Sequence, residues 1–127
     1  MLKLVFCLKR LPHLSRAEFQ RYWRETHAPL VRSHAGALGI RRYVQLHTAD
    51  DVVNDGLRAS RGGPPAYDGV AELWWDSAEA LGAAVVSPAG CAASTALLED
   101  ERRFIDLAAS PLFVGEEHEI VEILASR

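Results

Sequence analysis

The segment LKLVFCLKRLPHLSRAEFQRYWRETH, residues 2–27, places a short apolar run directly before a helix signal. The run Leu2–Leu8 is followed by two basic residues and a proline, which predicts a strand with both faces covered. Ser15 and Glu18 then have the spacing of a capping box, whose side chains accept from free backbone N–H groups at a helix start. The segment therefore predicts a strand and then a helix that begins after Ser15.

This predicted helix has one apolar stripe, formed at helical spacing by Phe19, Tyr22, Trp23, Leu30 and Val31. His27 and His34 follow Trp23 and Leu30 by four positions, so they fall on the same stripe. Pro29 predicts a break in the helix. We expect His27 to point toward the sheet, and His34 to lie at the helix end as a capping or edge residue.

Further elements follow along the chain. The segment IRRYVQLHT alternates as a strand does, and residues 50–65 are predicted to form a long loop with one helical turn at Val52–Arg58. The segment YDGVAELWWDS is a third strand, and a second helix follows it, pausing at Ser87 and Pro88. ASPLFVGE is predicted as a connector and EHEIVEILA as the last strand.

The order strand, helix, strand, strand, helix, strand is that of a ferredoxin-like α+β domain. We expect one domain over residues 1–127, with four antiparallel strands and both helices on one sheet face. The first and last strands carry apolar residues in both registers, so the uncovered face is predicted to pack against a second copy. The expected assembly is a homodimer in which two sheets form a barrel.

Composition narrows the function. A net charge of -3 and a pI near 5.9 argue against nucleic acid and anionic membrane as partners. The amino-terminal apolar run is too short for a signal peptide, and no stretch is long enough to span a bilayer. Cys7 and Cys91 lie far apart, which is typical of buried thiols in the reducing cytoplasm. We expect a cytoplasmic protein.

Several motifs together resemble the EthD family of the dimeric α+β barrel superfamily: FQRYWRETHAPLVRSH, RRYVQLHTADD, LRASRGGPPAYDGVAELWWDS and LLEDERRFIDLAASPLFVGEEHEI. The resemblance covers nearly the whole chain. It implies a small-molecule cleft between sheet and helices, with histidine and tyrosine as acid-base groups. Similar folds act as polyketide cyclases, isomerases, dehydratases, hydroxynitrile lyases and cofactor-free monooxygenases, so the resemblance implies the fold more narrowly than the reaction.

Four residues form the candidate catalytic group. Tyr43, Gln45 and His47 share one face of the second strand, and His27 lies on the helix stripe. We predict His47 as general base, Tyr43 as donor to a developing oxyanion, and His27 as second acid-base group or orienter. The alternatives are that His27 bonds a backbone carbonyl near Pro29 and that His47 is exposed at the strand end. A one-residue register slip decides whether this face meets the helices or the barrel.

The predicted substrate-binding residues are Gln45, Trp23, Glu72 and Trp74. Trp74 and Trp75 point to opposite sheet faces, so only one of them can share the polar face. Glu72 is predicted as either solvent-facing or a pocket acid. Asp68 is predicted as a loop anchor that pairs with Arg58 or Arg61.

No metal-binding or cofactor-binding motif is present. His27 and His34 lie seven positions apart with a proline between them, HExxH is missing, and SRGGPP lacks the lysine and hydroxyl of a phosphate loop. We predict neither a metal nor a cofactor.

Three functions remain open. The first is a cofactor-independent cyclase, isomerase, dehydratase or lyase acting on a small, mostly apolar carbonyl, aromatic or polyketide-type compound. The second is an oxidoreductase or accessory protein of an oxidative degradation pathway, as the family name suggests. The third is a homodimer that binds a small molecule without turnover.

Overall fold

The computed structural model describes residues 1–125. Its elements are β1 (Leu2–Leu8), α1 (Arg16–Tyr22), the π-helical turn η1 (Trp23–His27), α2 (Ala28–Leu38), β2 (Arg42–His47), α3 (Val52–Arg61), β3 (Gly69–Trp75), α4 (Ala78–Val86), α5 (Pro88–Glu101), the 3-10 turn η2 (Leu107–Ala109) and β4 (Leu112–Glu116). The order of strands and main helices is that of the predicted ferredoxin-like fold.

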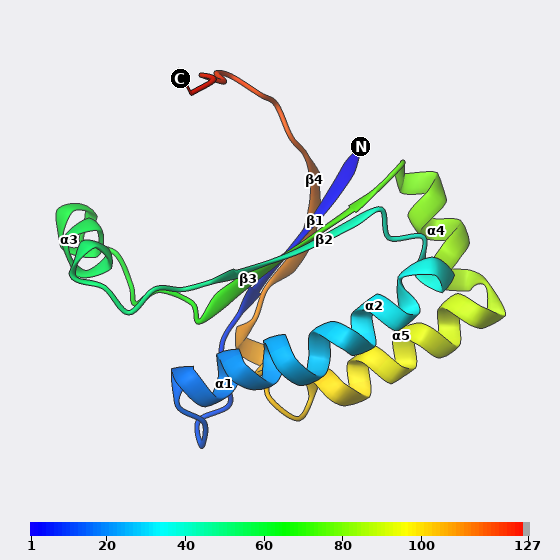
Figure 1. The fold of residues 1–127 in the computed structure, drawn as a ribbon, viewed down its shortest axis with the longest axis horizontal. Helices are drawn as coiled ribbons and strands as arrows, with labels where there is room; N and C mark the ends of the chain where they lie inside the picture. The colour runs from blue at the N-terminus through cyan, green and yellow to red at the C-terminus, as the bar shows by residue number, and fades with distance from the viewer. Residues whose placement is uncertain (126–127) are drawn as a thin grey trace.

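The four strands form one antiparallel sheet in the order β2-β3-β1-β4. Figure 1 shows α1, α2 and α5 together on one side of this sheet, with α2 and α5 running side by side. The aromatic core, made by Phe19, Trp23 and Phe104 with Leu8, fills the space between the two layers. The predicted two-layer α+β architecture is confirmed.

The first helix begins as predicted. The Ser15 hydroxyl accepts from Glu18 N–H, and the Glu18 carboxylate accepts from Ser15 N–H, at 3.1 and 2.9 Å.

The prediction of a helix break at Pro29 was wrong. A π-helical turn, in which Ala28 N–H donates to the carbonyl of Trp23, joins α1 to α2. Pro29 then stands in the first turn of α2, directly after this π-helical turn.

Helix α3 is longer than the single predicted turn. The Asp51 carboxylate caps its start by accepting from Val53 N–H, and Gly62, at φ 62°, ends it in the left-handed conformation. None of its residues is buried, and Figure 1 shows it standing away from the two layers.

The last strand is displaced from its predicted position. Residues 112–116, predicted as a connector, form β4, whereas residues 117–125 have no regular structure. The reason is the register with β1: Leu2, the first residue of β1, pairs with Glu116, so the following residues lie beyond the end of their neighbour.

The predicted pause in the second helix is confirmed. Ser87 ends α4 and its hydroxyl caps α5 by accepting from Gly90 N–H at 3.0 Å, with Pro88 in the first turn. No single helix within residues 1–125 is long and apolar enough to cross a membrane; α4 and α5 pass that test only together, and they are bent by 87°.

Candidate functional site

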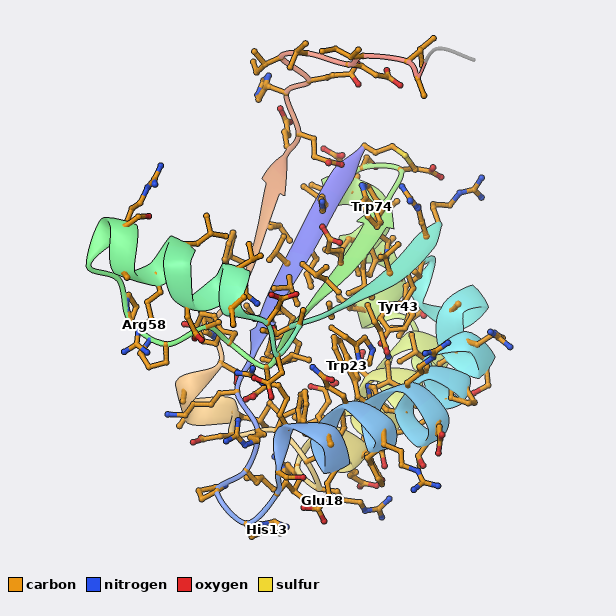
Figure 2. The ribbon with its side chains drawn as sticks, turned by 60° about the vertical axis from the view of Figure 1, so that its left-hand side comes forward. His13, Glu18, Trp23, Tyr43, Arg58 and Trp74 are labelled. Carbon is orange, nitrogen blue, oxygen red and sulfur yellow. The ribbon has the colours of Figure 1, made fainter. Side chains whose placement is uncertain are left out.

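The polar face of β2 meets the helices, which settles the question that the sequence left open. Tyr43 lies opposite Leu73, Gln45 opposite Ala71, and His47 opposite Gly69. The Gln45 Nε2 reaches the carbonyl of Trp23 in η1 at 3.0 Å. Figure 2 shows Trp23 and Tyr43 between the sheet and the first helices. These side chains therefore lie in the layer where the resemblance places a cleft.

Gln45 connects its two neighbours on this face. Because the carbonyl of Trp23 can only accept, the atom facing it is the amide nitrogen, which also donates to Tyr43 Oη at 2.8 Å. The amide oxygen then accepts from His47 Nε2 at 2.8 Å. Tyr43 is therefore an acceptor toward Gln45, and its own O–H remains free for another partner.

His47 lies behind Trp23. Its imidazole stacks on the indole with 4.5 Å between ring centroids and 27° between planes. Burial, with the nearby charge of Arg24, holds the pKa of His47 below its ordinary value, so the ring is neutral at pH 7. His47 is hydrogen-bonded to Gln45 and stacked on Trp23, and it does not line the cavity described below.

His27 is buried and bonded to a carboxylate. Its side chain is 6% exposed, and Nδ1 lies 2.7 Å from Asp100 Oδ2 in α5. The other Asp100 oxygen accepts from Tyr22 Oη at 2.6 Å and from Arg103 Nη1 at 3.1 Å. We had predicted either a backbone carbonyl or His47 as the partner of His27. Its Nδ1 instead bonds the Asp100 carboxylate, which was not predicted from the sequence.

The protonation of this pair follows from its surroundings. Burial acts to raise the pKa of Asp100, but the hydrogen bonds from Tyr22 and His27 outweigh it, and the net pKa lies below the ordinary value. Burial lowers the pKa of His27 more than Asp100 raises it. At pH 7 an ionised Asp100 therefore faces a neutral imidazole whose Nδ1 carries the proton. The lone pair is on Nε2.

A cavity of about 60 Å³ lies between α5, η1 and the sheet. Its polar lining consists of His27, Tyr43 and Glu101, with Trp23 beside them. The remaining wall is apolar and is made by Phe6, Leu8, Val31, Ala71, Leu73, Leu97 and Ile105. Within residues 1–125, every fully buried side-chain nitrogen or oxygen has a hydrogen-bond partner. Because Nε2 of His27 has none, this atom is not fully buried and faces accessible space. The cavity brings a base, a phenol and a carboxyl together.

Sequence reasoning missed Asp100 and Glu101. Asp100 lies among Ala93, Leu97 and Phe104, which recur at helical spacing, so a charged residue on an apolar stripe was the available signal. Burial, and then the charge of Asp100, raises the pKa of Glu101 to about 7. Glu101 lies four residues from both Leu97 and Ile105, so the same signal was available for it.

Glu72 and Trp74 do not belong to this site, contrary to our prediction. They lie opposite Val44 and Arg42, on the sheet face that no helix covers. Glu72 Oε1 lies 2.7 Å from Lys3 Nζ. The Trp74 ring lies between Lys3 and Arg42, at 4.7 and 4.6 Å from its centroid. The alternation of β3 sends these residues away from Ala71 and Leu73, which line the cavity.

The predicted partners of Asp68 also change. Asp68 anchors a loop as expected, but its partners are Arg16 Nε at 3.0 Å and Arg10 Nη1 at 2.5 Å. Arg58 instead donates to the carbonyl of Gly63, and Arg61 donates to the Ser60 hydroxyl. His34 is half-buried near the end of α2. Among the described residues, no group of three histidine, cysteine or acidic side chains is placed to hold a metal ion.

Comparison with known proteins agrees with this architecture. The family model of the EthD domain matches residues 11–108. An EthD family protein from Bacillus halodurans is 24% identical, with a TM-score of 0.61 over 93% of this chain and 99% of that one. An EthD-like protein from Ralstonia eutropha is 21% identical, with a TM-score of 0.56 over 91% and 90%. No curated protein matches the chain.

A third similar structure is SnoaB, a cofactor-independent oxygenase from Streptomyces nogalater. It is 18% identical to this chain, with a TM-score of 0.55 over 94% of this chain and 95% of its own. At these identities the likeness shows the fold.

Proposed function

The chain belongs to the EthD family, and from its cavity we propose that it is an acid-base enzyme that removes a proton next to the carbonyl of a small, mostly apolar compound. One observation carries the proposal. The Asp100-oriented imidazole of His27 and the hydroxyl of Tyr43 line the same cavity. A base and a hydrogen-bond donor at one small site are the two groups that enolisation needs.

The roles follow from the hydrogen bonds. His27 Nε2 takes the proton from the carbon, and Asp100 stabilises the imidazolium that forms. The electron pair of the broken C–H bond forms a carbon–carbon double bond, the π pair of the carbonyl moves to its oxygen, and the Tyr43 O–H donates to the charge that develops there. Burial keeps the pKa of Tyr43 above its ordinary value, although Gln45 opposes this, so the phenol holds its proton at pH 7. Returning the proton to another atom gives an isomerase, attack of the enolate carbon on a second carbonyl of the same compound gives a cyclase, and loss of a leaving group gives a dehydratase or lyase.

His47 receives a different role from the one we predicted. Its Nε2 holds the Gln45 amide, and that amide orients Tyr43. We therefore propose His27 as the base and His47 as a positioning residue behind Trp23.

Cavity size narrows the substrate class. About 60 Å³ is far below the roughly 300–1,000 Å³ of pockets for drug-sized ligands. The proposal is therefore a compound of one ring or smaller, and a polycyclic polyketide would need α5 to move away from the sheet.

Exchange of α-protons in D₂O tests the proposal without knowledge of the natural substrate. We expect the protein to speed deuterium incorporation into cyclopentanone, 2-butanone or acetone, followed by proton NMR. His27→Asn keeps a donor toward Asp100 but has no base, so it is expected to lower the rate by roughly 10²- to 10⁴-fold. The control His34→Asn changes a half-buried histidine outside the cavity and should match the wild type. Exchange no faster than buffer with all three ketones would refute the proposal.

The oxygenase SnoaB motivates an alternative. The same proton removal, applied to a phenol or enol, gives an electron-rich anion that can react with oxygen. Oxygen consumption that depends on His27 and on such a substrate would favour this oxidative reaction. Saturable ketone binding with neither exchange nor oxygen uptake would favour a non-catalytic binding protein.

We also propose that the chain is a homodimer. The sheet face opposite the helices is uncovered, and it exposes Leu46 and Phe113 by 57% and 56%. Packing two such faces together would remove these side chains from water.

A further inference from the structure

Glu101 is a carboxyl on the cavity wall, and no other residue of the described part of the chain pairs with it. It lies one turn after Leu97 in α5, and both side chains line the cavity. Asp100, the preceding residue, accepts three side-chain hydrogen bonds, whereas the Glu101 side chain makes no hydrogen bond or ion pair among the described residues. The proton-transfer roles proposed for His27 and Tyr43 leave this group unused.

The surroundings of Glu101 keep it protonated below about pH 7. Its pKa is raised to about 7, first by burial and then by the negative charge of Asp100. Burial lowers the pKa of His27 in the same cavity. A proton shared between these two groups therefore stays on the carboxyl, and the imidazole remains neutral. Around pH 6.5, Glu101 is a hydrogen-bond donor while His27 is a base.

Tyr43 can supply a second hydrogen-bond donor beside Glu101. Because its oxygen accepts from Gln45, its O–H is free to donate into the cavity. We propose that the Tyr43 hydroxyl and the protonated Glu101 carboxyl form a two-donor oxyanion site, which binds the oxygen of a small ketone and of the enolate derived from it. The site deepens the proposed function and rests on it for the enolate, but not for binding of the ketone.

A protonated Glu101 that acts as a second donor suits the proposed reaction better than an ionised Glu101 that acts as a second base. An ionised Glu101 would place a negative charge beside the developing oxyanion and would repel it. A neutral carboxylic acid in an apolar site instead donates a short, strong hydrogen bond to that oxygen. Glu101 would then touch the reacting oxygen while His27 handles the carbon-bound proton.

The site is expected to respond to pH through Glu101. The titratable groups that face it or bear on it are His27 in η1, Tyr43 in β2 and Asp100 in α5. Above about pH 7 Glu101 loses its proton, so a ketone loses one donor and meets a negative charge. Tyr43 and Asp100 keep their forms in this range. Protonation of His27 at lower pH adds a donor and does not remove one.

Cyclopentanone is a suitable probe because it only accepts hydrogen bonds and does not titrate. Binding is measured by NMR titration at pH 6 and pH 8.5, and the carbonyl stretch of the bound ketone by infrared spectroscopy. Loss of one neutral hydrogen bond is worth roughly a 3- to 10-fold change in affinity. We expect the wild type to bind that much more weakly at pH 8.5 and to shift the carbonyl stretch less.

Two variants separate donation from packing. Glu101→Gln keeps an N–H donor that does not titrate, so it should bind equally at both pH values. Glu101→Met removes the donor and should bind roughly 3- to 10-fold more weakly than the wild type at pH 6. Glu99→Gln, an exposed acid on the same helix, is the matched control and should reproduce the wild-type pH dependence. Thermal unfolding by circular dichroism establishes that each variant is folded.

The outcomes separate this site from the proposed reaction. The oxyanion site is overturned if the wild type does not bind at pH 6, if Glu101→Gln keeps the wild-type pH dependence, or if Glu101→Met binds as the wild type does. If the wild type catalyses no proton exchange but the binding pattern holds, the reaction fails and the oxyanion site stands.

Discussion

Replacing Asp100 by alanine should strongly destabilise the fold, because this carboxylate is a buried hydrogen-bond centre. Its side chain is 6% exposed, and it accepts from Tyr22 at 2.6 Å, from His27 at 2.7 Å and from Arg103 at 3.1 Å. Asp100→Ala would leave the first two donors without their partner. The contact spans 73 residues in sequence between His27 and Asp100, so it joins α5 to the first helix.

The size of the effect can be worked from these contacts. A hydrogen bond to a charged group contributes roughly 1.5–3 kcal/mol, so the Tyr22 and His27 bonds dominate. The Arg103 side chain is 69% exposed, and its ion pair contributes about 0–1 kcal/mol after solvent screening. Because interacting groups are not additive, we expect a loss of about 3–5 kcal/mol in the free energy of unfolding. That is a large share of the roughly 5–15 kcal/mol typical of a domain.

Urea unfolding followed by tryptophan fluorescence measures this loss, at one fixed protein concentration since dimerisation would contribute to stability. Asp100→Asn, which keeps the shape and an acceptor, should lose less than Asp100→Ala. Glu99→Ala is the control, since an exposed substitution on the same helix is usually worth within about 0.5 kcal/mol. A loss below about 1 kcal/mol for Asp100→Ala would show that the network does not hold α5, and the reasoning would fail.

Three further predictions follow from single features. The wild type should lose stability relative to His27→Asn as pH drops below about 6.5, because burial lowers the pKa of His27 in the folded state and the unfolded chain takes up the proton first; Glu101, whose pKa is raised to about 7, acts in the opposite direction in both proteins and cancels in this comparison of unfolding free energies. Gly69→Ala should lower stability by roughly 1–3 kcal/mol, since a Cβ there would collide with the Trp23 ring and lie 2.8 Å from the Leu46 carbonyl, while Gly115→Ala, where space is open, should not; equal melting temperatures would contradict this. Leu46→Asp should yield monomers in analytical ultracentrifugation, whereas Val86→Asp, at a still more exposed helix position, should not; an unchanged sedimentation coefficient for Leu46→Asp would argue against the proposed sheet-to-sheet dimer.

Local signals in the sequence were enough for most of the fold. The capping box of Ser15 and Glu18 locates the first helix, and the alternation of β2 puts Tyr43, Gln45 and His47 on one face. The face itself depends on pairing with β3, which alternation within a single strand does not contain. The last strand failed for the same reason: residues 112–116 and 117–125 both carry apolar side chains, and only the register with β1 selects the first.

The candidate site was harder to predict because its chemistry comes from distant contacts. His27 was expected to be an acid-base group from its place on the helix stripe, yet its orientation depends on Asp100 in another helix. Glu101 shares an apolar stripe with Leu97 and Ile105, but that this stripe lines a cavity depends on how α5 packs against the sheet. A side chain gains an altered pKa from burial and neighbouring charge, and both arise only when the layers pack.

The π-helical turn η1 is a local feature that also makes contacts with residues distant in the sequence. The carbonyl of Trp23 accepts from Ala28 N–H across the turn and also from the Gln45 side chain. The second bond fixes which end of the Gln45 amide faces His47, and therefore that Tyr43 is an acceptor toward Gln45 and a free donor toward the cavity. The same turn ends at His27, whose Nδ1 is held by Asp100. The π-helical turn η1 thus orients both the proposed base and the proposed donor. Such turns are frequent in functional sites. A change that converts η1 to a regular α-helix should therefore weaken both roles together, even though it touches neither His27 nor Tyr43.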